Sequence, residues 1–306
     1  MKIVITGAAG LVGQNLIARM AGQHQIVAID KHPANLRILR QLHPEIEVIE
    51  ADLSQPGDWT TAFAGAEAVV HGHAQIGGLH EEEFLRNNIE ASKRVIEAIK
   101  AAGSPYVVNI SSSVVNSAAV DWYTETKKAQ EKLVLEAGFE QVILRPTLMF
   151  GWFDRKHLGW LARFMQRVPV FPIPGNGKYL RQPLYVGDFC RIIEQSIARR
   201  QTGAFNITGL QRIDYIELMR AVKIATGAKA AIITIPYGLF ALMLRTYALI
   251  DKNPPFTVAQ LKALVTPDIF EVIDWPGLFG VTPTPLAEAL KETFQDPRYA
   301  DVSLEF

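Results

Sequence analysis

The chain has 306 residues, of which 49% are hydrophobic and 20% charged, a composition typical of a globular protein with one large or two smaller domains. Its 31 Lys and Arg residues balance its 31 Asp and Glu residues, so no basic excess indicates nucleic-acid binding. The single cysteine, Cys190, excludes an intramolecular disulfide, and an apolar strand directly at the N-terminus leaves no signal peptide to expect, so we predict a cytoplasmic protein.

The first half of the chain alternates short apolar runs with helical patterns. We expect strands at residues 2–5, 25–29, 48–51, 68–71, 106–110 and 142–144, and helices that include 83–101 and 123–136. Alternating strands and helices predict a parallel sheet with helices on both faces. The fold class expected is therefore α/β, a Rossmann-type doubly wound parallel sheet with a smaller C-terminal α/β substrate lobe.

After Gly151 prolines and glycines become frequent, and the predicted elements are helices at 186–198 and 215–226 and a strand at 204–207. We predict a dinucleotide-binding domain over residues 1–150, to which 180–210 return, and a substrate-binding lobe formed mainly by 151–306. A ligand crevice is expected at the carboxyl ends of the strands, between the two lobes.

The most apolar stretch, residues 232–250, contains Pro236, Gly238 and Arg245. These interruptions argue against a membrane span. We expect a buried or interface helix over about 239–250, and a helix lying on a membrane surface is the alternative.

Three glycines follow the first strand at a spacing of three and lead into a helical pattern. In this context Gly7 allows the tight turn, Gly10 lets backbone approach a pyrophosphate, and Gly13 brings the helix close to the sheet. Asp30 ends the second strand, where a carboxylate accepts hydrogen bonds from a ribose diol and repels a 2′-phosphate, so NAD is the expected cofactor. Lys31 and His32 weaken the expected preference for NAD over NADP, because either side chain can reach a 2′-phosphate. Contacts from the turn are expected from Gly7, Ala9, Gly10, Leu11, Val12 and Gly13.

Tyr123 and Lys127 are four residues apart on a predicted helix and therefore share one face. A nearby ammonium favours the phenolate, so the pair can move a proton on a substrate hydroxyl while hydride moves to or from nicotinamide. Ser111, Ser112 and Ser113 follow the strand at 106–110, and one of them can hydrogen-bond the reacting oxygen. We favour Ser112 as the catalytic serine, with Ser113 second.

These motifs resemble those of the extended and atypical short-chain dehydrogenase/reductases, the NAD-dependent epimerase/dehydratase family. Matching segments also include residues 52–53, 70–71, 88–92, 144–146 and 181–188. The resemblance implies that Asp52 and Leu53 flank adenine, that Lys127 holds the nicotinamide ribose, and that Thr147 lies near the nicotinamide amide. Arg181 would meet a substrate phosphate or base. The further cofactor contacts that we expect are His71, Gly72, His73, Asn88, Ser111, Tyr123 and Pro146, and the further substrate contacts are Gln75 and Ser113.

Departures from the family pattern narrow the reaction. Tyr123 lies only eleven positions after Ser112, a shorter gap than in typical sugar-nucleotide epimerases, and the missing substrate-contacting loop argues against a standard sugar nucleotide. No Asp-Glu pair follows Ser112, so dehydration is not expected. The histidines His71, His73 and His80 form no ligand set with metal geometry, so no metal site is predicted.

The leading hypothesis is an NAD-dependent oxidoreductase or epimerase that acts on a secondary alcohol of a small molecule, first of all a nucleotide-sugar. One alternative is an oxidoreductase like the 3β-hydroxysteroid dehydrogenases, with a hydroxylated lipid as substrate. The other is a non-catalytic NAD-binding accessory subunit or sensor, against which the retained tyrosine–lysine pair argues. By resemblance, the helices at 83–101 and 123–136 lie where relatives form a four-helix interface, so we expect a homodimer.

Overall fold

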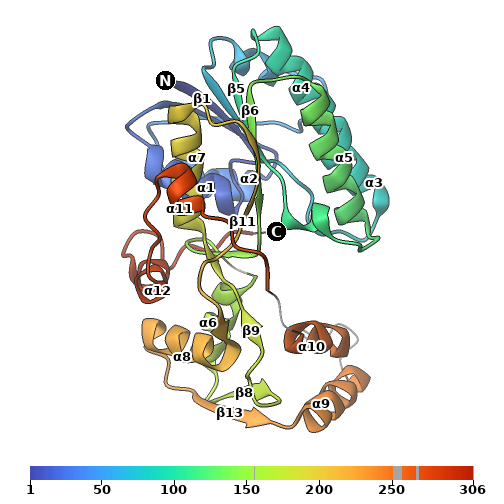
Figure 1. The fold of residues 1–306 in the computed structure, drawn as a ribbon, viewed down its shortest axis with the longest axis vertical. Coiled ribbons are helices and arrows are strands. Elements are labelled where there is room, and N and C mark those ends of the chain that lie inside the picture. Colours follow the sequence, from blue (N-terminus) through green and yellow to red (C-terminus); the bar gives the residue numbers. More distant parts are fainter. Residues whose placement is uncertain (155, 251–256, 267–268, 306) are drawn as a thin grey trace.

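A parallel sheet of seven strands forms the centre of the larger lobe in the computed structural model, which describes residues 1–154, 156–250, 257–266 and 269–305 (Figure 1). In sheet order the strands are β11 (Gly203–Ile207), β6 (Gln141–Pro146), β5 (Tyr106–Ile110), β4 (Ala68–His71), β1 (Lys2–Thr6), β2 (Gln25–Asp30) and β3 (Glu47–Glu50). Strand order reverses between β1 and β4, which is where a doubly wound sheet opens a ligand crevice.

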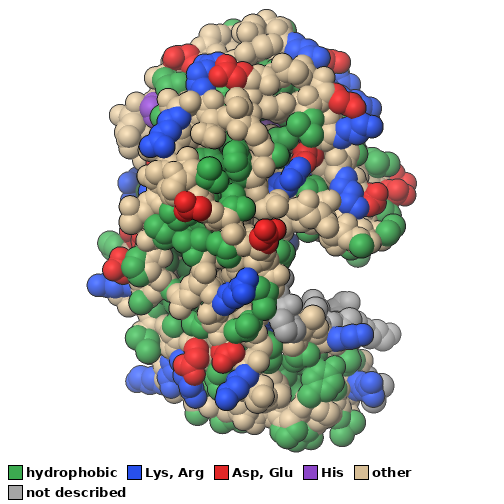
Figure 2. Space-filling view, viewed as in Figure 1, with side chains coloured by type: hydrophobic (Ala, Val, Ile, Leu, Met, Phe, Trp, Pro, Cys, Tyr) green, Lys and Arg blue, Asp and Glu red, His purple; other side chains and the backbone are tan. Residues whose placement is uncertain are grey.

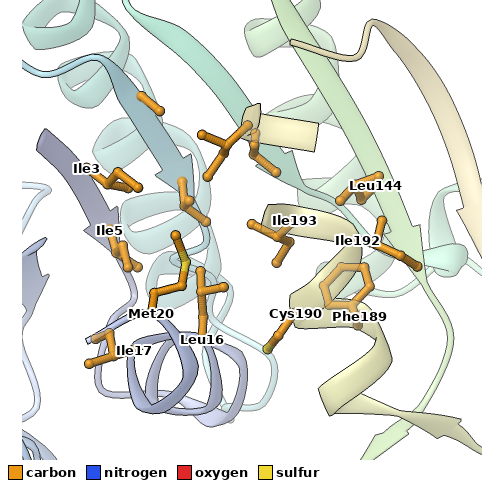
Figure 3. Packing of buried hydrophobic residues seen from close by; sticks show 14 of the residues in the cluster. Ile3, Ile5, Leu16, Ile17, Met20, Leu144, Phe189, Cys190, Ile192 and Ile193 are labelled. Atoms are coloured by element: carbon orange, nitrogen blue, oxygen red, sulfur yellow. The ribbon is translucent and has the colours of Figure 1, made fainter. Parts of the chain in front are cut away.

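Helices cover both faces of this sheet, as the alternating pattern predicted. Alternate side chains of each strand face opposite sides, so Ile3 and Ile5 of β1 pack on one helical layer and Val4 on the other. The first layer, shown in part in Figure 3, contains α1 (Leu11–Met20), α2 (Pro33–Leu42), α7 (Val186–Arg199) and α11 (Trp275–Phe279). The second layer contains α4 (Ala91–Ala101), α5 (Trp122–Glu136) and the 3-10 helix η1 (Asp58–Phe63). The expected fold class is confirmed.

The helix predicted over 83–101 is divided into three segments. α3 (Glu81–Phe84) passes into the π-helical segment η2 (Leu85–Glu90) and then into α4. Asn88 lies in η2, and its side-chain amide donates 3.0 Å to the Thr126 hydroxyl and 3.1 Å to the Gln75 carbonyl. Wider helical turns of this kind occur often at functional sites, and here η2 turns Asn88 toward α5.

The smaller lobe has its own apolar core. That core joins α6 (Leu158–Arg167), α8 (Tyr215–Thr226) and α12 (Leu286–Gln295). Pairs of short strands complete the lobe and its junction: β8 (Val170–Pro174) with β13 (Ala231–Ile235), β9 (Leu180–Arg181) with β12 (Ile213–Asp214), and β7 (Met149–Phe150) with β10 (Leu184–Tyr185). A 3-10 turn, η3 (Ser113–Asn116), follows β5. The segment expected to return to the larger lobe supplies α7 and β11; the domain boundaries themselves stay a prediction.

The apolar segment forms α9 (Tyr237–Ile250), and α10 (Val258–Val265) follows at the same end of the smaller lobe (Figure 1). This helix is not buried within the chain, because Leu239, Leu242 and Met243 are each about half exposed. The interface helix of the same expectation and the membrane-surface alternative stay predictions. Hydrophobicity predicted the helix but not its environment, since apolar side chains also occur on surfaces that contact other molecules. No helix among the described residues is long and apolar enough to cross a bilayer.

Candidate active site

A cavity of about 640 Å³ lies at the carboxyl ends of β1, β4, β5 and β6. The face drawn in Figure 2 is hollowed between the larger lobe and the α9–α10 end of the smaller lobe. The volume of the cavity falls within the usual range for small-molecule and cofactor sites. The sequence-predicted residues that line it are Gly7, Gly10, Leu11, Val12, Gly13, Asp30, Asp52, Leu53, Gly72, His73, Gln75, Ser111, Ser112, Ser113, Tyr123, Lys127, Pro146 and Thr147. Ala9, His71, Asn88 and Arg181 are not among its lining residues.

The glycine turn fits a dinucleotide. Gly7 has a φ of +69°, and a Cβ there would lie 2.7 Å from backbone atoms of Gly72. A Cβ at Gly13 would lie 2.5 Å from the carbonyl oxygen of Ala8, so the first turn of α1 can lie close against the strand end. Gly10 precedes α1 without a side-chain cap, which leaves backbone N–H groups of the first helical turn available for a phosphate.

At the expected ribose end, Asp30 is held by backbone. Its Oδ2 accepts a hydrogen bond from Ala9 N at 3.0 Å, and its Oδ1 accepts from Lys31 N at 2.7 Å. Ala9 therefore helps to position the Asp30 carboxylate and does not itself line the cavity. The Lys31 ammonium donates to Asn87 Oδ1 at 2.7 Å, and burial lowers the pKa of Lys31. Asp30 and Asp52 thus place two carboxylates at this end of the cavity, which opposes a 2′-phosphate.

The predicted nicotinamide end contains an unused hydroxyl. Thr147 Oγ1 is buried and has no hydrogen-bond partner within the described part of the chain. A buried polar group without a partner is costly and rare in native proteins, so a partner supplied by a bound ligand is the natural explanation. Together with the glycine turn, this hydroxyl shows that the residues present fit a dinucleotide.

Ser112 and Tyr123 both line the cavity. The Ser112 hydroxyl is near enough to the Tyr123 side chain to lower the pKa of the phenol, and it accepts a hydrogen bond from Val114 N at 3.4 Å. Ser111 is engaged elsewhere, since its hydroxyl donates to Glu131 Oε2 at 2.5 Å. Of the three candidate serines, Ser112 is the one whose hydroxyl reaches the tyrosine, while Ser113 lines the cavity at the start of η3.

Lys127 lies fully buried below the tyrosine on the same helix. Its ammonium donates to the Ile110 carbonyl at 3.0 Å and to Gln130 Oε1 at 2.6 Å. Burial lowers the pKa of Lys127 to about 8, against a raising effect of the Glu131 carboxylate. The expected lowering of the Tyr123 pKa by this ammonium is not found: burial raises the pKa of Tyr123, and only its hydrogen bond with Ser112 lowers it.

Two histidines stand side by side under the glycine turn, with ring centroids 4.5 Å apart. His73 lines the cavity and is fixed by the hydroxyls of Thr6 at 3.0 Å and Ser92 at 3.2 Å. His71 lies behind it against Asn109. Burial lowers the pKa of His71 to about 4 and the pKa of His73 well below its ordinary value, so both rings are neutral at pH 7.

Asn88 acts behind the cavity wall. Its Oδ1 accepts from Gln75 N at 2.6 Å, which fixes the segment that carries Gln75, a predicted substrate contact. Its neighbour Asn87 lines the cavity instead. A contact of Asn88 with the cofactor stays a prediction.

Arg181 lies at the junction with α10. Its guanidinium donates to the carbonyls of Leu180 at 3.1 Å and Thr266 at 2.8 Å and stacks over the Tyr179 ring at 5.3 Å. An ion pair of Arg181 with Asp188 is not formed, because Asp188 pairs with Arg191. A role for Arg181 in substrate binding stays a prediction.

Sequence reasoning missed several lining residues: Ile76, Asn87, Val114, Leu148, Met149, Lys156, His157 and Phe270. The Asp154 carboxylate places two of them, because its Oδ1 accepts from Lys156 N and His157 N at 3.0 Å each. An acidic residue before a helix is a visible N-terminal signal. Phe270 follows α10 and reaches the cavity only through the tertiary fold.

A Rossmann sheet, a glycine turn that fits a dinucleotide, and a Ser–Tyr–Lys group define the class of dinucleotide-dependent short-chain dehydrogenase/reductases. Residues 3–208 match the model of the NAD dependent epimerase/dehydratase family, and the chain belongs to that family. The protein is therefore an enzyme of an NAD-dependent family, which confirms the expected family, enzyme class and cofactor.

Individual relatives differ in substrate. The chain is 28% identical to a ceramide reductase of Caulobacter vibrioides over 76% of its own length and 73% of the relative. It is 25% identical to a 2-alkyl-3-oxoalkanoate reductase of Stenotrophomonas maltophilia, covering 92% of this chain and 95% of that protein. In fold it is similar to the UDP-glucose 4-epimerase of Thermotoga maritima solved with UDP-glucose, with a TM-score of 0.75 and 19% identity over 96% of this chain and 97% of the other.

Proposed function

We propose that this enzyme transfers a hydride between NAD(H) and a secondary alcohol or ketone of a lipid substrate. The observation that carries the proposal is the apolar wall that continues from Ser112 and Thr147. That wall contains Ile76, Val114, Leu148, Met149 and Phe270. Such side chains match an acyl chain or a ring system better than they match the hydroxyls of a sugar.

Several polar groups of the cavity have a task in this reaction. When bound, NAD(H) supplies the hydride chemistry. The glycine turn and the N-terminus of α1 bind the pyrophosphate, and the third N–H of the Lys127 ammonium is left for the nicotinamide ribose once Ile110 and Gln130 are satisfied. Thr147 offers its hydroxyl to the carboxamide.

Tyr123 and Ser112 act on the substrate oxygen. Because burial raises the pKa of Tyr123, the phenol is protonated at pH 7 and is ready to donate to a carbonyl oxygen. In the reduction direction, hydride adds to the carbonyl carbon and the phenol proton goes to the oxygen, which gives the alcohol. Ser112 hydrogen-bonds the phenol and orients it toward that oxygen.

The sequence relatives support a lipid substrate. The names of the two curated relatives identify reductases of ceramide and of 2-alkyl-3-oxoalkanoates, both of which carry long hydrocarbon chains. Arg181, the residue expected to meet a nucleotide phosphate, instead donates to the Thr266 carbonyl. Reduction of a lipid ketone therefore takes precedence over our first expectation.

A nucleotide-sugar remains the second candidate. Lys156 lines the cavity and supplies a cation that a phosphate would require. The similar fold of a UDP-glucose 4-epimerase is compatible with this use. A non-catalytic NAD-binding role is not supported, since Ser112, Tyr123 and Lys127 all line one cavity.

The test compares 3-oxo lipids of increasing chain length with UDP-sugars, reading NADH consumption and thermal shift. We expect turnover of the ketones with a KM that falls as the chain lengthens. Phe270→Ala should raise the KM for long chains more than for short ones, whereas its exposed neighbour, varied as Ile269→Ala, should change neither. Turnover of a UDP-sugar without turnover of any ketone would replace the lipid proposal with the nucleotide-sugar one.

We further propose a cytoplasmic homodimer joined through η2 and α5. Leu85, Trp122 and Leu135 are large apolar side chains exposed on these elements, as an interface requires. Light scattering at micromolar concentration tests the assembly, and a mass of 34.0 kDa, that of one chain, would refute it.

A further inference from the structure

α9 presents one continuous apolar stripe to the outside of the molecule. Leu239, Leu242, Met243 and Tyr247 are between 46% and 56% exposed. Their spacing of three and four residues puts them on the same side of the helix. Ala241, on the opposite side, is buried against the protein. Phe240 and Leu244 are partly buried, so the four exposed side chains form the outer side of the helix.

The two helices at this end of the lobe carry cations and no acid. α9 contains Arg245, α10 contains Lys262, and neither helix contains Asp or Glu. Figure 2 shows apolar and basic side chains together at the α9–α10 end of the smaller lobe. Exposed apolar side chains beside cations are what a helix lying in a membrane interface presents.

The dimensions of α9 favour lying on a membrane over crossing one. Its 14 residues extend about 21 Å, shorter than the hydrocarbon core of a bilayer. A helix of this length buries its apolar side among the acyl chains while its cations remain at the level of the phosphates. The acyl chains of the bilayer then cover the exposed leucines and the methionine, and no transmembrane segment is needed.

The same end of the lobe is tied to the cavity. Arg181 donates to the carbonyl of Thr266, just after α10, and Gln182 Oε1 accepts from Phe270 N at 2.9 Å. Phe270 belongs to the apolar wall of the cavity. The end of α10 and the cavity residue Phe270 are therefore both hydrogen-bonded to the adjacent residues Arg181 and Gln182.

From these observations we propose that α9, with the basic residues around it, docks the enzyme on a bilayer that contains anionic phospholipid. A second copy of the chain fits this surface less well, because pairing two such faces would bring Arg245 and Lys262 toward the same cations of the other copy, with no Asp or Glu on either helix to pair with them. Docking on a membrane goes beyond the proposed function. It rests on that function in one respect only, namely that docking would bring the cavity to a lipid substrate.

The test is co-sedimentation of the full chain with vesicles of phosphatidylcholine alone or mixed with phosphatidylglycerol, without substrate. We expect binding to the mixed vesicles that weakens as salt is raised, because exposed charges are screened. Leu242→Glu combined with Met243→Glu should lower the partition at least about tenfold, since each charge opposes burial in the acyl region. Leu278→Glu, at an apolar residue of α11 that is 44% exposed, is the matched control and should bind like the unaltered chain.

NADH affinity verifies the fold of each variant and should be equal in all. Absence of binding to mixed vesicles, or full binding by the α9 variant, would overturn the proposal. A dimer that dissociates on the α9 substitutions, without vesicle binding by the unaltered chain, would assign the stripe to self-association. Vesicle binding without ketone turnover would remove the proposed function and leave the membrane surface standing, so the two failures are distinguishable.

Discussion

Glu131→Gln tests the charge cluster that supports the catalytic group. The Glu131 carboxylate accepts from Arg145 Nε at 3.0 Å and from the Ser111 hydroxyl, and its side chain is only 8% exposed. The glutamine side chain has nearly the same shape as glutamate but no charge. It leaves the Arg145 guanidinium, whose side chain is 21% exposed, without its counter-ion. Breaking a buried charge pair at one partner costs several kcal/mol, and the partial exposure of Arg145 moderates this to about 2–4 kcal/mol.

The same substitution should change cofactor binding. The Glu131 carboxylate raises the pKa of Lys127 against the effect of burial, so its loss should lower that pKa below about 8. Lys127 then loses its charge at a lower pH, and the fall in NAD affinity at alkaline pH should begin about one unit earlier, the lower end of the usual effect of a neighbouring charge.

Urea unfolding and NAD titration across pH measure both effects. Glu140→Gln is the matched control, because Glu140 is paired with Arg200 in a similar two-pronged arrangement on the exposed surface. That variant should unfold like the unaltered protein. If Glu131→Gln is as stable as Glu140→Gln, with an unchanged pH dependence, the role assigned to the cluster is refuted.

Three further outcomes are expected. NAD affinity of the unaltered protein should weaken as pH rises through about 8, because Lys127 is charged below that value and neutral above it; a flat calorimetric profile would contradict this. Gly7→Ala should lose more stability and more NAD affinity than Gly65→Ala, since both glycines have a φ near +70° but only Gly7 has backbone within 2.7 Å of the added Cβ. Asp30→Ala should narrow a preference for NAD over NADP, and titrations showing tighter NADP binding by the unaltered chain would refute that preference.

Local sequence patterns were sufficient to predict the strands, helices and glycine turn that carry the site. The strand at 106–110 and the helix at 215–226 have in the structure the bounds that their sequence patterns predicted. Gly13 could be assigned because its close neighbour, Ala8, lies within a few residues, and Gly7 because its positive φ belongs to the local turn; the approach of Gly72 to Gly7 comes from the fold. Tyr123 and Lys127 could be paired because helical spacing fixes which side chains share a face.

Contacts across the fold could not be predicted in this way. The π-helical segment η2 lies within the range where the sequence predicted one continuous helix, and Asn87, which that prediction did not select, lines the cavity. Phe270 enters the site from a distant segment. Apolar composition predicted that α9 is a helix, but the same composition fits a core and a membrane surface equally well.

The central claim is that Tyr123 supplies the proton while NADH reduces a lipid ketone. The most direct measurement mixes enzyme preloaded with NADH with a long-chain 3-oxo lipid and follows nicotinamide absorbance, for the unaltered protein and for Tyr123→Phe. The account predicts that both bind NADH equally, and that the rate of NADH oxidation falls by roughly 10²–10⁴ in the variant, the usual contribution of a positioned proton donor. Oxidation of NADH by Tyr123→Phe at the rate of the unaltered protein would contradict the account.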